Sequence, residues 1–174
     1  MPSIVAYNQS ASWFPRARRG AASGTSYFDG MAMDHHMFDN VFVDPDALRA
    51  FRATGMWPDG TVFAKESRGG QTKGSINKTG EFQREPVEGL ELHVKDSVRF
   101  KGGWAFFEFG SNDPARQIPT KASCYACHQT HAAVDTTFVQ FYPTLIGIAR
   151  AKKTFSASYL SEIRASTDSG AGKL

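Results

Sequence analysis

The feature that most constrains this chain is the run Cys124-Tyr125-Ala126-Cys127-His128, which has the pattern C-x-x-C-H and contains the only two cysteines of the 174 residues. Thiols at this spacing can form thioethers with the two vinyl groups on one edge of a haem, and the adjacent imidazole then reaches the iron. The run therefore predicts one covalently attached haem c with His128 as the axial ligand. A fold that carries it must wall in a large apolar macrocycle, and 14 Phe residues are available.

Other interpretations of the two cysteines fit less well. A disulfide between them would close a very short loop and contribute little stability. A thioredoxin-type redox pair requires a βαβ context, which the surrounding pattern does not show. A zinc site formed by this motif and His131 would be cramped, because the usual sites separate their ligand pairs along the sequence. The sequence therefore favours haem attachment.

The sequence shows no evident second axial ligand. Each candidate methionine or histidine is more commonly a surface or packing residue: Met31, Met33, Met37, Met56, His35, His36 and His93. An open sixth position on the iron would allow ligand chemistry rather than simple electron transfer.

Charge and hydropathy argue against several classes of protein. The net charge of +3, from 20 basic and 17 acidic side chains, is too small to indicate nucleic-acid binding. The basic cluster Arg16, Arg18 and Arg19 lacks a recognisable binding fold and is interpreted as part of a solvated arm. No run of about 18 apolar residues predicts a membrane span.

The chain is expected to act outside the cytoplasm. Bacterial haem c is attached after export, so the motif predicts a periplasmic protein. Residues 1–19 contain no apolar run longer than Ile4–Tyr7, and we therefore expect the signal peptide to be absent from this sequence. We expect an irregular arm over residues 1–30, a c-haem domain over 31–153 and a tail over 154–174.

Short alternating segments predict antiparallel strands joined by turns. The expected strands are Asn40–Val43, Thr61–Ser67, Leu90–Val94 and Trp104–Phe109, with a polar hairpin loop over residues 68–86. Period-2 alternation places Phe63 and Lys65 on one face of the second strand. In the third strand it places Leu90, Leu92 and Val94 toward the core, with Glu91 and His93 on the opposite side. The fourth strand is apolar on both faces.

Helix signals are fewer than strand signals. Asp44 as N-cap and Pro45 at the first position predict a helix that ends near Thr54, before Gly55, with Leu48 and Phe51 on one face. Further helical segments are expected at Ala122–His131 and at Phe138–Tyr142, the latter stopped by Pro143, and the tail should hold at most one short helix near Tyr159–Arg164. The predicted class is α+β, mainly β: an antiparallel sheet with a few helices and a C-terminal haem segment.

From about Val41 to residue 145 the chain resembles the cytochrome P-460 family. The resemblance rests on the order and spacing of several pieces: Val41-Phe42-Val43-Asp44-Pro45, Thr54-Gly55, Asp59-Gly60-Thr61-Val62-Phe63-Ala64-Lys65-Glu66, Gly89-Leu90-Glu91, Val94-Lys95-Asp96, Gly103-Trp104-Ala105-Phe106-Phe107, the haem motif, and Phe138-Val139-Gln140-Phe141-Tyr142-Pro143. It implies a mostly antiparallel β fold, usually a homodimer, with a five-coordinate haem c near the C-terminal end of the domain.

The resemblance also implies a third covalent link to the haem, from a lysine amine, and Lys65 is the matching residue. Lys65 lies mid-strand among apolar residues, and a pocket of that kind disfavours the charged form and leaves a nucleophilic amine. The alternative is a lysine at a strand edge whose ammonium reaches solvent. Glu91 matches the family's distal carboxylate and could accept protons from a bound substrate. Phe63, Phe106 and Phe107 are candidate walls of the pocket.

Two kinds of function follow from the haem motif and the resemblance together. One is a haem-dependent oxidoreductase that oxidises hydroxylamine, or reacts with nitric oxide or peroxide, and passes electrons to a soluble partner. The other is a binding protein for nitric oxide or another gas, like the related cytochromes c′-beta, or an electron-transfer protein without turnover. Asp39 stands where many family members carry Arg, which puts efficient hydroxylamine turnover in doubt. The sequence assigns no role to His131.

Overall fold

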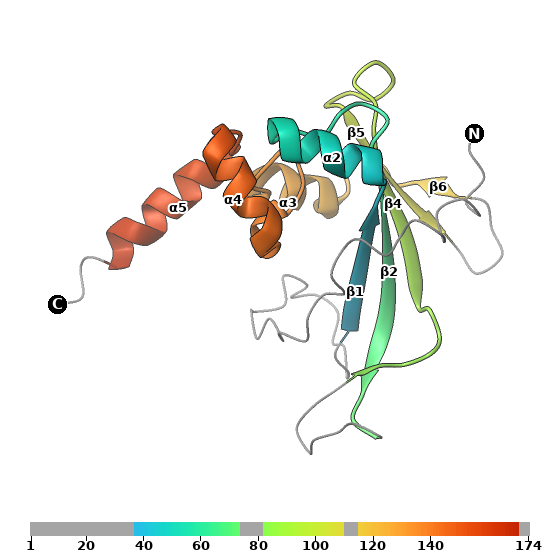
Figure 1. The fold of residues 1–174 in the computed structure, drawn as a ribbon. Helices are drawn as coiled ribbons and strands as arrows, with labels where there is room; N and C mark the ends of the chain where they lie inside the picture. Colours follow the sequence, from blue (N-terminus) through green and yellow to red (C-terminus); the bar gives the residue numbers. More distant parts are fainter. Residues whose placement is uncertain (1–36, 74–81, 110–114, 171–174) are drawn as a thin grey trace. The chain divides into compact units, whose positions relative to one another are not determined.

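The computed structural model describes residues 37–73, 82–109 and 115–170 (Figure 1). The elements in these ranges follow one another in the order β1 (Met37–Val43), α2 (Pro45–Thr54), β2 (Val62–Gln71), β3 (Phe82–Gln83), β4 (Gly89–Lys95), β5 (Trp104–Phe109), β6 (Arg116–Gln117), α3 (Ser123–His131), the 3₁₀ turn η3 (Val139–Phe141), α4 (Pro143–Lys152) and α5 (Ala157–Gly170). The strands form a six-stranded antiparallel sheet in the order β1-β2-β4-β5-β6, and β3 pairs with β2. The predicted α+β class is confirmed.

The chain divides into two compact units. Within the described ranges, the first contains residues 37–44, 62–73, 82–93, 106–109 and 115–117, and the second contains 45–61, 94–105 and 118–170. Strands β4 and β5 each contribute residues to both. Of the helices in the described ranges, none combines the length and apolar character needed to span a bilayer.

The first unit is built on a long antiparallel pairing of β1 with β2. The register runs from Met37 opposite Gly69 to Val43 opposite Phe63, and it places Lys65 opposite Val41. Strand β2 continues to Gln71 and pairs there with β3, so the predicted loop over residues 68–86 begins too early. Residues 74–81 of that loop lie outside the described residues.

A polar cluster joins β1, β2 and β3. The buried amide of Asn40 exchanges two hydrogen bonds with the amide of Gln83, each 2.8 Å long, and also donates to Glu66 Oε1 at 3.2 Å. Arg68 Nε lies 2.5 Å from the same carboxylate oxygen. Paired amides satisfy each other's donors and acceptors, which makes the burial of Asn40 tolerable and fixes the register of the strands.

Strand β4 differs from its prediction. All seven of its residues are half-buried, so no separate core face of Leu90, Leu92 and Val94 exists. His93, expected on the opposite side, stacks on the buried ring of Phe106 with 4.0 Å between ring centroids. The partition into faces was wrong because Phe106 packs against His93. In β5, Trp104, Ala105 and Phe106 are all buried, which confirms a strand apolar on both faces.

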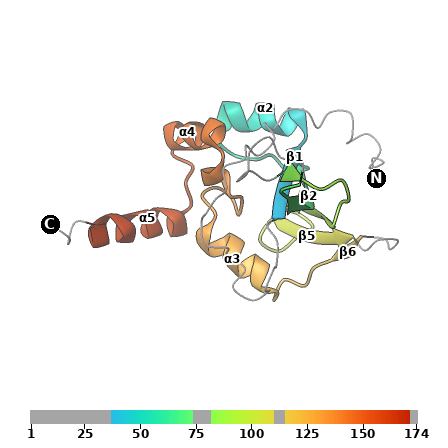
Figure 2. The same cartoon turned by 90° about the horizontal axis from the view of Figure 1, so that it is seen from below.

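In the second unit, α2 begins at Pro45 and ends before Gly55, as predicted. Gly55 has φ +77°, and its N–H donates to Phe51 O at 2.7 Å, which closes the last turn of the helix. A Cβ at Gly55 would lie 2.7 Å from the Cβ of Lys152, so glycine is required there. Phe51 is fully buried and stacks on Trp57 at 4.2 Å, and α2 packs against α4 (Figure 2).

The C-terminal region contains more helix than the sequence indicated. Helix α3 is confirmed, but the segment Phe138–Tyr142 yields only the turn η3, and Pro143 occupies the first turn of α4 rather than only ending a helix. Proline is accepted there because the first turn needs no N–H partner. The short helix expected near Tyr159 is the 14-residue α5. Ser156 Oγ accepts the N–H of Tyr159 at 3.1 Å and so caps its start.

Acid should weaken the polar cluster of the first unit through Glu66. The hydrogen bond from Arg68 is the main reason that the pKa of Glu66 lies below its ordinary value of 4.5, and the Arg68 charge and Asn40 add to the effect. A lowered folded-state pKa stabilises the fold above the unfolded-state pKa, and this contribution disappears as pH falls through the folded value. We expect stability to fall below about pH 4.5, and Glu66→Gln to flatten that fall while lowering stability near neutrality.

Urea midpoints measured from acid to neutral pH would check this, with the exposed Glu85→Gln as the matched control. Equal pH profiles for Glu66→Gln and the wild type would contradict the assignment.

Candidate haem site

Helix α3 presents the two cysteines of the motif on one face. Cys124 and Cys127 are three residues apart, a spacing that brings side chains to neighbouring positions on a helix surface. Both are half-buried and are not joined in a disulfide. Between them, Tyr125 is buried, and its hydroxyl lies 3.3 Å from the carbonyl of Ile118. This contact anchors the helix and leaves the cysteines on another side of it.

The imidazole of His128 has a defined tautomer. Its Nδ1 lies 2.8 Å from the backbone oxygen of Thr136. A carbonyl oxygen only accepts, so Nδ1 carries a proton, and the lone pair of a neutral ring is then on Nε2. This is the form in which histidine binds a metal, with the second nitrogen oriented by a hydrogen bond. The ring of Phe138 lies 4.5 Å from the imidazole, at 58° to it.

The Thr136 carbonyl belongs to a tight turn in an uncommon conformation. Val134 and Thr137 form an isolated antiparallel bridge, in which Thr137 N donates to Val134 O at 2.7 Å. The two central residues, Asp135 and Thr136, have φ values of 49° and 59°. Two positive φ values define a type I′ turn, which favours Asn and Gly. Holding non-glycine residues there costs about 1–3 kcal/mol each, so other contacts must stabilise the turn.

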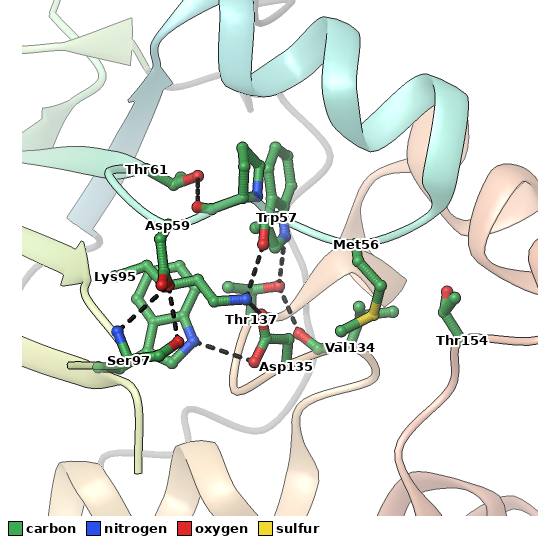
Figure 3. A network of polar contacts seen from close by, with 12 residues as sticks. Met56, Trp57, Asp59, Thr61, Lys95, Ser97, Val134, Asp135, Thr137 and Thr154 are labelled. Atoms are coloured by element: carbon green, nitrogen blue, oxygen red, sulfur yellow. Dashed lines mark hydrogen bonds and ion pairs between the residues drawn. The ribbon is translucent and has the colours of Figure 1, made fainter. Parts of the chain in front are cut away.

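Those contacts form a buried polar network around Asp135, drawn in Figure 3. One carboxylate oxygen accepts from Trp104 Nε1 at 3.1 Å, and the other pairs with the ammonium of Lys95. Lys95 also donates to the carbonyl of Trp57 at 2.6 Å, and the Trp57 indole N–H donates to Thr137 Oγ1 at 2.9 Å. The turn is thereby tied on both flanks to segments about 40 and 80 residues away in sequence.

Further contacts hold the C-terminal end of α3. The Gln140 side chain donates to His131 O at 2.7 Å and accepts from Ala133 N at 3.0 Å, which satisfies groups that the helix end leaves without intrahelical partners. His131, unexplained by the sequence, lies with Nδ1 2.8 Å from Glu162 Oε1 on α5. Ser158 Oγ donates to Gln129 O at 3.1 Å. Helix α5 therefore packs on the helix that carries the motif.

The environment of Cys127 favours a thiol over a thiolate. Burial raises the pKa of Cys127, and the negative charge of Glu162 adds to the shift. Redox-active and zinc-binding cysteines instead lie where positive charge lowers the thiol pKa. In the described residues, no three His, Cys, Asp or Glu side chains converge on a position that could hold a metal ion. Two thiols and one imidazole with its lone pair on Nε2 fit a haem c, which brings its own iron and needs one protein ligand.

The other predicted site residues lie in the first unit. Lys65 Nζ is 3.1 Å from Glu91 Oε1, so the structure brings the proposed nucleophile and the proposed proton acceptor together. Their side chains are 24% and 36% exposed, and Lys65 therefore lies in a mixed rather than a purely apolar environment. Phe63 and Phe106 are buried, while Phe107 is half-buried. Asp39, at the position of the family arginine, is exposed and accepts from Ser67 Oγ at 2.5 Å.

The candidate sixth ligands are only partly within the described residues. Met31, Met33, His35 and His36 lie outside them, as does the side chain of Met37. Met56 is 39% exposed in the second unit. His93 belongs to the first unit, where it packs on Phe106.

Comparison with known proteins places the chain in a family. Residues 22–139 match the family Cytochrome P460. No curated protein matches the chain. Because the match covers more than half of the residues, the chain belongs to the cytochrome P460 family. It is therefore a cytochrome with haem-dependent redox activity, and iron is its metal.

The sequence did not indicate the residues that hold the hydrogen-bond acceptor of His128 in place. Lys95 and Asp135 are ordinary charged residues in the sequence, and nothing in their spacing indicates that they pair. Asp135 after a helix is a weak turn signal. Their role follows from the turn that holds the hydrogen-bond acceptor of His128.

Removing the Gln140 amide should loosen the end of α3. Gln140→Leu leaves His131 O and Ala133 N without these partners, and an unsatisfied buried group costs about 1–3 kcal/mol. We expect a loss of that order in the free energy of urea unfolding. Gln129→Leu, the same change at an exposed position of α3, is the control. Equal stability of the two variants would show that the cap contributes nothing.

Proposed function

We propose that this chain is a mono-haem c-type cytochrome of the P460 type that oxidises hydroxylamine. In this proposal Cys124 and Cys127 carry the haem and His128 binds the iron. The observation that carries the enzymatic part is the contact between Lys65 and Glu91, because it joins the two residues that the family pattern marks for chemistry. When bound, the haem supplies an iron that takes up a small ligand and accepts its electrons.

Glu91 serves as the proton acceptor. Converting two hydroxylamine molecules to nitrous oxide and water releases four electrons and four protons, so the site must remove protons as well as electrons. A carboxylate within hydrogen-bond reach of the substrate nitrogen can accept them, one at a time, and pass them to solvent. The 36% exposure of Glu91 supports this relay, since the carboxylate is open to water.

Lys65 forms the third covalent link to the haem. The new bond joins Lys65 Nζ to a haem carbon, and one hydrogen leaves each atom, which is a two-electron oxidation. Hydrogen peroxide serves as the oxidant and is reduced to two water molecules. The amine must be neutral to attack, and Glu91 Oε1 at 3.1 Å is placed to take its proton first.

One observation favours a second function, the binding of nitric oxide or another gas without turnover. Asp39 carries a negative charge where many family members have an arginine that can bind or polarise a ligand. Its carboxylate is exposed and bonded to Ser67, so it does not substitute for a cation. In this alternative the haem lacks the Lys65 link, as in the cytochromes c′-beta.

The cellular setting follows from the same chemistry. Haem c attachment after export makes the protein periplasmic, and released electrons pass to a soluble acceptor protein. The family pattern implies a homodimer. A peroxide-dependent reaction at an open iron remains compatible with these residues.

The mass and spectrum of the holo-protein test the link to Lys65. We expect the mass of the polypeptide plus one haem, less two hydrogens, together with a ferrous Soret band far to the red of an ordinary haem c. Lys65→Met should restore the ordinary spectrum, whereas Lys101→Met, at an exposed position, should leave it shifted. A haem-linked peptide from a proteolytic digest should contain Lys65. An ordinary spectrum in the wild type would exclude the link.

Turnover tests the role of Glu91. Loss of a general base typically costs about 10²–10⁴-fold in rate, so Glu91→Gln should lower hydroxylamine-dependent reduction of an artificial acceptor by about that factor. Glu85→Gln removes an equally charged but exposed carboxylate from the same unit and should keep the rate. No turnover in the wild type, with tight nitric-oxide binding, would favour the gas-binding alternative.

A further inference from the structure

We propose that Asp135, clamped by Lys95 and Trp104, is a positioning residue for His128 and thereby sets the electron donation of the imidazole to the haem iron. The inference rests on the proposed ligation of the iron by His128. It concerns residues to which neither the family pattern nor the motif assigns a role. Its starting point is the 2.8 Å hydrogen bond between His128 Nδ1 and the Thr136 carbonyl.

The position of that carbonyl depends on a turn that its own sequence does not favour. Asp135 and Thr136 both have positive φ, and Thr136 is β-branched, a type rarely found in this region. A type I′ turn of this composition is weakly specified by local preference, so alternative turn geometries compete with it. Any of these would redirect the Thr136 oxygen away from His128.

Two side chains from another part of the second unit hold the turn in place. Lys95 ends β4 and Trp104 begins β5, and each binds a different oxygen of the Asp135 carboxylate. Figure 3 shows Lys95 directed toward Asp135. Lys95 is itself fixed by backbone hydrogen bonds, from its N–H to Thr61 O at 2.8 Å and from Gly60 N to its carbonyl at 2.9 Å. The side chains of Lys95 and Asp135 are only 12% and 18% exposed. The clamp is thus largely shielded from water, and its two side chains come from strands rather than from the turn itself.

The electronic consequence follows from hydrogen-bond strength. A well-aligned Nδ1–H···O bond makes the imidazole more basic at Nε2 and favours oxidised iron. A loosened turn lengthens or bends this bond, so the imidazole donates less electron density. The iron–histidine bond then weakens, and the reduction potential rises.

Loss of a charge near the iron would also move the potential, but with a different pattern. Asp135→Asn removes a negative charge, which by simple electrostatics raises the potential. Lys95→Met removes a positive charge, which lowers it. Positioning predicts the same direction for both variants, because either one removes the ion pair that holds the turn. The pair of substitutions therefore separates geometry from charge.

The experiment measures the reduction potential and the iron–histidine stretching band of the ferrous holo-protein by resonance Raman spectroscopy. We expect Asp135→Asn and Lys95→Met both to raise the potential and to move the band to lower frequency. Asp46→Asn is the matched control, since it removes the same charge from an exposed ion pair with Arg49 and should move neither reading.

A further variant separates the clamp from the turn conformation. In Asp135→Gly, the glycine adopts positive φ without strain but lacks the carboxylate that Lys95 and Trp104 bind. It should shift the band as Asp135→Asn does. A wild-type band would mean that the turn conformation alone suffices, and the proposal would be wrong. If the charged-residue variants do not accumulate with haem, Trp104→Phe removes the hydrogen bond from the indole to Asp135 and leaves both charges in place, and an unchanged band in that variant would overturn the proposal.

Opposite shifts in potential, or an unchanged band in both Asp135→Asn and Lys95→Met, would also overturn it. The wild-type protein distinguishes this failure from failure of the proposed function. Absence of an iron–histidine band from a five-coordinate ferrous wild type would refute ligation by His128. A normal band that does not respond to the variants would refute only the clamp.

Discussion

The ion pair of Lys95 with Asp135 is the contact on which the second unit depends, because it joins the end of β4 to the loop that follows α3. Both side chains are largely buried, and removing one partner of such a pair typically costs about 3–5 kcal/mol, since it leaves the other charge uncompensated. Two tryptophans complete the arrangement. Trp104 shares the carboxylate, while Trp57 accepts from Lys95 through its carbonyl and donates to Thr137 through its indole. The positive φ values of the turn are tolerated because these contacts together hold it in this conformation.

The first unit is organised differently, by paired strands rather than by a single ion pair. The amide pair of Asn40 and Gln83 and the hydrogen bond from Asn40 to Glu66 fix the register of β1, β2 and β3. That register decides which residues share a face, because a slip by one position would move every side chain to the opposite face of the sheet. Lys65 and Glu91 lie 3.1 Å apart in the resulting sheet. Their contact is therefore a product of strand pairing as much as of residue type.

The segment beyond the family match also supports the motif. The match ends at residue 139, whereas α4 and α5 follow it. Helix α5 contacts α3 through the His131–Glu162 pair and through the bond from Ser158 to Gln129 O. Glu162 adds to the upward shift in the pKa of Cys127, which burial mainly causes. The C-terminal helix thus shapes the chemistry of the motif from outside the region that defines the family.

By itself, the sequence determined the elements whose signals are local. The C-x-x-C-H run predicted its own helix, Pro45 and Gly55 marked the ends of α2, and the aromatic run from Trp104 predicted a strand buried on both faces. The order of the short motifs also indicated the family to which the chain belongs. These features depend on spacing and on backbone preference, which a sequence carries directly.

Only the tertiary structure decided the rest. The Ser- and Ala-rich tail gave no sign of a 14-residue helix, because α5 is stabilised by packing on α3 rather than by its own propensity. Period-2 alternation assigned the faces of β4 wrongly, because the stacking of Phe106 on His93 is a contact between strands. Likewise, the carbonyl that orients His128 comes from a turn held by Lys95, about 40 residues earlier. Such contacts join residues that are distant in sequence, and no local pattern encodes them.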